Sequence, residues 1–101
     1  MARETRSVDV ALLGHLNDFV ASRKGVEVWV ERPTSLNPAS VLLVAHDGEW
    51  TRRSVPSVEF GHSFAIEHGL PSYDAGVMGY PQRMRDYDAK RRPPRSGPRL
   101  A

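Results

Sequence analysis

Apolar residues recur every three or four positions between residues 7 and 24, which places them along one face of a helix. These residues are Leu12, Leu13, Leu16, Phe19 and Val20. Ser7 or Asp9 can cap the start of the helix, and Gly25 can end it. The pattern therefore predicts an amphipathic helix over residues 7–24.

The next segment, residues 26–31, alternates strictly between two kinds of side chain. One face carries Val26, Val28 and Val30, and the other carries Glu27, Trp29 and Glu31. This period of two predicts a strand that ends before Pro33. Residues 41–45 are continuously apolar, which is typical of a central strand covered on both faces.

A hairpin is predicted after the apolar strand. Asp47-Gly48 favours a tight turn into a second extended segment. If that turn has two residues, Ala45 pairs with Trp50 across the hairpin. We expect the second strand, residues 50–55, to be a sheet edge protected by its charged side chains.

Further elements are predicted in the second half of the chain. Ser57 can cap a second helix, in which Phe60 and Phe64 supply the buried side. Residues 70–74 indicate a short extended return that can add a fourth strand. A glycine-punctuated loop follows, and Pro81 suits the first turn of a third helix.

Together these segments predict an α+β fold with the order α–β–β–β–α–(β)–α. The sheet has three to four strands and is expected to be mainly antiparallel. Because the chain has 101 residues, it fits a single domain, which we place at residues 1–90. Residues 91–101 are rich in proline and arginine and predict a disordered basic tail.

Composition excludes several classes of protein. The chain has no cysteine, so a disulfide scaffold, a thiol nucleophile and thiolate metal sites are excluded. Its apolar runs are shorter than the roughly 20 residues of a membrane-spanning helix. The start of the chain lacks the apolar stretch that is typical of a secretory signal. We therefore expect a cytoplasmic protein without membrane contacts.

Charge is distributed unevenly along the chain. Residues 1–82 hold seven basic and ten acidic side chains, whereas residues 83–101 hold seven basic and two acidic ones. A basic end of this kind can bind a phosphate backbone, although it can also be a solvated tail. The nucleic-acid contacts would be Arg91, Arg92, Arg95 and Arg99.

Candidate catalytic groups are few. Residues 61–65 approach the G-x-S-x-G motif of serine hydrolases, but they lie in a predicted helix and no histidine follows Asp74. The four histidines lack the spacing of metal ligands. We therefore predict no catalytic, cofactor-binding or metal-binding residues. A small enzyme that uses His62 with Glu59 or Asp74 is the weakest alternative.

Trp29 shares a strand face with two glutamates, and Trp50 can lie on the same face. Exposed aromatic and arginine side chains are common anchors of protein interfaces. The alternatives are a helix that covers this face or a homodimer that buries it. The predicted partner-binding residues are Trp29, Tyr80, Arg83 and Arg85. We therefore predict a non-enzymatic protein-interaction module, with nucleic-acid binding as the alternative.

Three segments carry a family resemblance. They are WVERPT at 29–34, VLLVAHDGEWTRR at 41–53 and GYPQRMR at 79–85. They resemble a family of small, uncharacterised actinobacterial proteins over about residues 20–90. The resemblance implies no established activity, ligand or fold.

Overall fold

The computed structural model describes residues 2–91, with side chains from Val10 onward. Arg91, the first residue of the predicted tail at 91–101, is helical, and residues 92–101 lie outside the described residues. No helix within residues 2–91 is both long and apolar enough to cross a bilayer.

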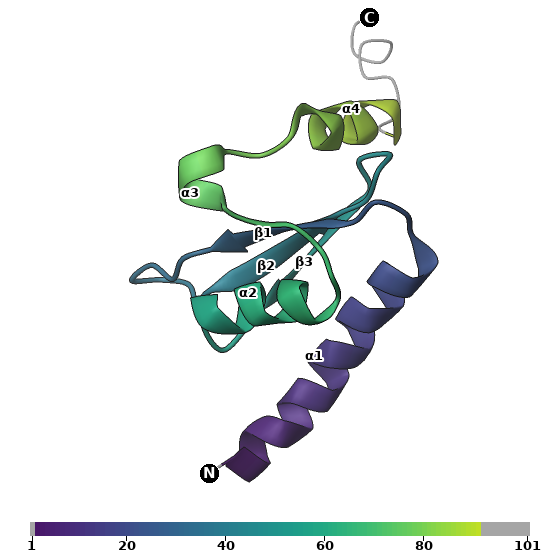
Figure 1. Cartoon of the computed structure of the whole chain (residues 1–101). Coiled ribbons are helices and arrows are strands. Elements are labelled where there is room, and N and C mark those ends of the chain that lie inside the picture. The colour runs from purple at the N-terminus through teal and green to yellow at the C-terminus, as the bar shows by residue number, and fades with distance from the viewer. Residues whose placement is uncertain (1, 92–101) are drawn as a thin grey trace, which may run out of the picture.

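The described elements follow the predicted order, with one short helix in the predicted glycine-punctuated loop (Figure 1). They are α1 (Ala2–Ser22), β1 (Glu27–Glu31), β2 (Ser40–Val44), β3 (Trp50–Ser54), α2 (Val58–Glu67), β4 (Ser72–Asp74), α3 (Ala75–Met78) and α4 (Gln82–Arg91). Helix α1 begins before the predicted caps Ser7 and Asp9, so neither residue caps its start.

The sheet is mixed, so the prediction of a mainly antiparallel sheet is wrong. Its strand order is β3-β2-β1-β4. Strand β2 is antiparallel to β1 and β3, but β4 is parallel to β1. The reason is the connection through α2, which runs back along the sheet and lets β4 enter in the direction of β3 and β1.

Helices α1 and α2 cover one face of the sheet (Figure 1). The core on this face contains Leu16, Phe19, Val26, Val28, Val30, Ala39, Val41, Leu43, Ala45, Val55, Phe64 and Ala65. Helix α2 approaches the strands closely at Gly61, where a Cβ atom would lie 2.9 Å from Cγ1 of Val41. A larger side chain at Gly61 would therefore push α2 away from the sheet.

Helices α3 and α4 lie over the opposite face (Figure 1), so β2 is covered on both faces as predicted. The smaller core on this face contains Trp29, Leu42, Val44 and Ala75, with Trp50, Tyr73 and Met84 packed against it. Helix α4 has no buried residue of its own. Polar contacts must therefore supply much of what holds α4 in place.

The hairpin between β2 and β3 has a longer turn than predicted. Ala45 N donates to Glu49 O at 2.8 Å, and Gly48 adopts a φ of 99°. Trp50 consequently pairs with Val44, and the predicted pairing with Ala45 is wrong. This shift by one residue places Trp50 and Arg52 on the α4 face of the sheet.

Candidate functional site: an open cleft at the end of the sheet

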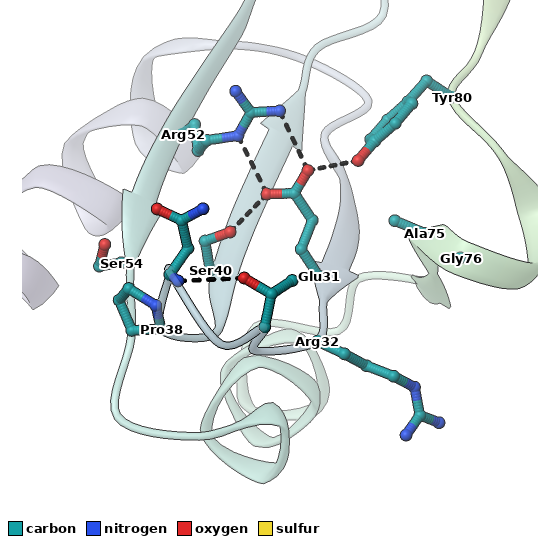
Figure 2. A pocket seen from close by; sticks show the side chains of 11 residues that line it. Glu31, Arg32, Pro38, Ser40, Arg52, Ser54, Ala75, Gly76 and Tyr80 are labelled. Atoms are coloured by element: carbon teal, nitrogen blue, oxygen red, sulfur yellow. Dashed lines mark hydrogen bonds and ion pairs between the residues drawn. The ribbon is translucent and has the colours of Figure 1, made fainter.

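An open cleft of about 660 Å³ lies where β1 and β3 end and β2 begins (Figure 2). A polar row in register across these strands lines it, formed by Glu31, Ser40 and Ser54. The connection between β1 and β2 forms one wall. Helix α3 and Tyr80 form the other.

The carboxylate of Glu31 is the centre of a polar network in this cleft (Figure 2). Arg52 donates from Nε to Oε1 and from Nη2 to Oε2, each at 3.0 Å. The hydroxyl of Ser40 donates to Oε1, and that of Tyr80 donates to Oε2. Four donors fill the acceptor positions of a carboxylate, so Glu31 is committed to linking β1, β2, β3 and the segment that carries Tyr80.

The ionisation of this pair follows from its contacts. Burial raises the pKa of Glu31, but the hydrogen bonds from Arg52, Ser40 and Tyr80 together outweigh it and hold the pKa below the ordinary 4.5. Burial and the neighbouring carboxylate of Glu31 raise the pKa of Tyr80 above its ordinary value. At neutral pH the carboxylate is therefore ionised and the phenol protonated, which suits a fixed hydrogen bond better than proton transfer.

Asp74 has a structural role at the α3 side of the cleft. Its Oδ2 accepts from Arg32 Nη2 at 2.9 Å, and its Oδ1 accepts from the backbone N–H of Gly76 at 2.9 Å. The hydrogen bond from Arg32 lowers the pKa of Asp74. His62 bonds instead to Ser72, with 2.7 Å between Nδ1 and Oγ. These contacts give Asp74 and His62 separate partners rather than one shared site.

The two segments that line the cleft also carry large exposed apolar side chains. Among the described side chains, four of the six with this character belong to segments 34–38 and 75–80, which line it. They are Leu36, Val77, Met78 and Tyr80, which are 40% to 88% exposed. Exposed apolar side chains near one another on a surface are typical of interaction sites.

Trp29, predicted as a partner-binding residue, lies beneath α4 and is only 6% exposed. Its ring centroid is 4.8 Å from that of Tyr73, and the guanidinium of Arg83 lies 5.7 Å from it. Its Nε1 is buried with no hydrogen-bond partner among the described residues. The structure thus matches the alternative in which a helix covers Trp29.

Arg83 links α4 to the sheet through hydrogen bonds. Its Nη2 lies 2.7 Å from Oε1 of Glu27, and its Nε donates to the carbonyl oxygen of Ala45 at 3.0 Å. Arg85 is exposed and donates to Gln82 on its own helix. Of the four predicted partner-binding residues, Tyr80 is the one that lines the cleft.

The predicted nucleic-acid contacts fall mostly outside the described residues. Arg91 is exposed at the end of α4, with its guanidinium 5.3 Å from the ring of Tyr87. Arg92, Arg95 and Arg99 lie outside the described residues.

Glu31, Ser40 and Arg52 could not be recognised as a group from the predicted register. Alternation already placed Glu31 on the face of Trp29, but the assumed two-residue turn assigned β3 to the wrong register. With Leu42 opposite Arg52 and Ser40 opposite both Glu31 and Ser54, one polar row emerges at the sheet end. Correct turn length was the missing signal.

Comparison with protein-family models, curated proteins and solved structures gives no match. The resemblance to a small actinobacterial family therefore stays a prediction. Among the described residues, no group of three or more His, Asp or Glu side chains is placed to hold a metal ion.

Proposed function

We propose that the chain is a protein-interaction module whose cleft binds a peptide segment of another protein. The observation that carries this proposal is that the two segments lining the cleft, 34–38 and 75–80, also carry exposed apolar side chains, of which Tyr80 lines the cleft itself. Such side chains contribute affinity by leaving water when a partner covers them.

The polar floor of the cleft supports binding rather than catalysis. Glu31 is ionised and saturated by Arg52, Ser40 and Tyr80, so it offers no free acceptor for a proton in this arrangement. The same network fixes Tyr80 at the cleft wall. A preorganised wall lowers the entropic cost of binding a partner.

Charge indicates the chemistry of the bound segment. Arg52 gives Nε and Nη2 to Glu31, which leaves the N–H groups of Nη1 for a further acceptor. We therefore assign the cleft a segment with one apolar anchor beside Val77 and Met78 and a carboxylate directed at Arg52.

Selection of peptides of about twelve residues by display on the purified chain tests this function. Enriched peptides should combine an apolar anchor with an acidic residue. They should bind the Val77→Ser/Met78→Ser variant about tenfold more weakly, because the apolar contact is lost. Ile66→Ser is the matched control, since Ile66 is 76% exposed on α2 and should leave binding unchanged.

Three outcomes would contradict the proposal. One is a library without enrichment, and another is a set of peptides that bind wild type and cleft variant equally. The third is a concentration-dependent dimer that the cleft variant abolishes, because it would assign the cleft to a second copy of the chain.

Nucleic-acid binding is the second candidate, favoured by the exposed cations of α4. Arg85 and Lys90 are exposed, but Arg83 is engaged with Glu27 and Ala45. Binding to a labelled oligonucleotide that falls steeply with rising salt would support this candidate. Loss of that binding in an Arg85→Gln/Lys90→Gln variant would assign it to α4.

A further inference from the structure

The outer edge of β3 has no paired strand among the described residues. Strand β3 stands at one end of the sheet order, and within residues 2–91 no segment pairs with its outer side. An open strand edge presents backbone donors and acceptors that can pair with an added strand.

The hydrogen-bond pattern shows which backbone groups face outward. Ala45 N donates to Glu49 O at 2.8 Å, and Val55 N donates to Ala39 O at 2.9 Å. Hydrogen-bonded pairs in an antiparallel ladder recur every two residues. The odd-numbered residues between Glu49 and Val55 therefore pair with β2, and the even-numbered residues direct their N–H and C=O groups outward.

Arg52 and Ser54 supply the exposed outward groups. An independent contact agrees with this pattern, because Nη1 of Arg53 donates to the carbonyl oxygen of Arg52 at 2.8 Å. Arg52 and Ser54 are both exposed, and both side chains line the cleft. Side chains of an added strand that lie on this face would therefore enter the cleft.

Charge on β3 selects the kind of strand. Arg53 contacts no carboxylate among the described residues, since its hydrogen bonds go to His15, Thr51 and Arg52. Arg52 and Arg53 are adjacent, so their side chains leave opposite faces of the sheet. Two adjacent carboxylates on an added strand would meet one arginine on each face.

A second copy of the chain fits this edge poorly. Pairing two β3 edges would bring Arg52 and Arg53 of both copies together, and like charges across a strand pair are unfavourable. The edge therefore favours a partner whose charge is opposite to its own.

We propose that the outer edge of β3 binds an extended segment of another protein that carries two adjacent acidic residues, by strand addition. This inference deepens the proposed function and rests on it. It states that backbone pairing at Arg52 and Ser54 places the bound segment beside the cleft.

Two synthetic peptides test the inference by titration into the isotope-labelled full chain. The acidic peptide is acetyl-Thr-Val-Glu-Glu-Val-Thr-amide, and its control carries Lys-Lys in place of Glu-Glu. The acidic peptide should bind about tenfold more tightly, because both cross-strand charge pairs change sign in the control. Amide exchange at Arg52 and Ser54 should slow by about tenfold when it is bound, whereas Thr51 and Arg53 are already paired.

A charge reversal supplies a further readout. Arg53→Glu should weaken the acidic peptide and strengthen the lysine peptide, while Lys24→Glu, at an exposed residue outside β3, should change neither. Equal binding of the two peptides, or binding without slower exchange at Arg52 and Ser54, would overturn the inference. If display-selected peptides still depend on Val77 and Met78 in that case, the proposed function stands without strand addition.

Discussion

Gly48 lies so close to α4 that a Cβ atom on it would be 2.0 Å from the carbonyl oxygen of Arg83. The same atom would be 2.9 Å from Cβ of Tyr87, and the φ of 99° at Gly48 is strained for any other residue. The hairpin turn and α4 can therefore pack together only because this position is glycine.

Gly48→Ala should displace α4 from the sheet. We expect the free energy of unfolding to fall by about 2 kcal/mol or more, since overpacking and backbone strain act together. Chemical denaturation measures this loss, and tryptophan emission should shift to the red as Trp29 meets water. Gly14→Ala is the control. A Cβ atom there meets nothing within 4 Å, so this exposed helix position should gain about 0.5–1 kcal/mol.

The hydrogen bond from Trp50 Nε1 to Asp88 Oδ1, at 3.0 Å, should also hold α4 against the sheet. Asp88→Ala should lower the free energy of unfolding by about 1–2 kcal/mol, because a donor next to the core loses a charged acceptor. Asp86→Ala should cost less, since Asp86 is exposed and, within the described part of the chain, its hydrogen bond is with Gln82 on its own helix. Equal losses of unfolding free energy in the two variants would contradict a fastening role for Asp88.

Local patterns predicted the elements that bury a regular face. The alternation in residues 26–31 placed the valines in the larger core and Trp29 on the opposite face. The continuous run 41–45 correctly predicted a central strand. Both predictions succeed because burial on one or two faces imposes its period directly on the sequence.

Features that depend on long-range geometry could not be predicted from local patterns. The parallel β4 depends on where α2 returns the chain, which three residues of strand cannot reveal. The polar network at Glu31 depends on a turn longer by one residue, and that single residue decides which face receives Arg52. The burial of Trp29 depends on α4, a mostly polar helix in which Met84 is the residue that packs against the core around Trp29.

The network at Glu31 should make the free energy of unfolding depend on pH in the acidic range. The depressed pKa of Glu31 in the folded chain means that its contribution is present above the unfolded pKa and is lost as pH falls through the folded value. Wild type should exceed Glu31→Gln by about 1–2 kcal/mol of unfolding free energy at pH 7, the amount expected for partly exposed charged hydrogen bonds. The difference should shrink as the pH falls well below 4.5, as followed by denaturation at several pH values.

The exposed carboxylate of Glu59 supplies the control for loss of one negative charge. Glu59→Gln should not reproduce the stability difference that Glu31→Gln shows at pH 7. A difference between wild type and Glu31→Gln that persists unchanged into acid would show that ionisation of Glu31 is not what stabilises the network.

His15 should add a second pH dependence on the opposite face of the sheet. Its Nε2 lies 2.8 Å from Oγ1 of Thr51. Burial and the nearby charge of Arg53 lower the pKa of His15 below 6.5, against the opposing effect of Asp18.

The folded chain thus binds a proton at His15 less readily than the unfolded chain does. Stability is therefore full above the unfolded pKa and falls as the solution is acidified through it. His15→Gln keeps a hydrogen-bonding group for Thr51 without titrating, so wild type should lose stability relative to this variant as the pH falls below the ordinary histidine pKa. NMR titration of the His15 ring measures the same effect directly, and a midpoint at or above 6.5 would contradict it.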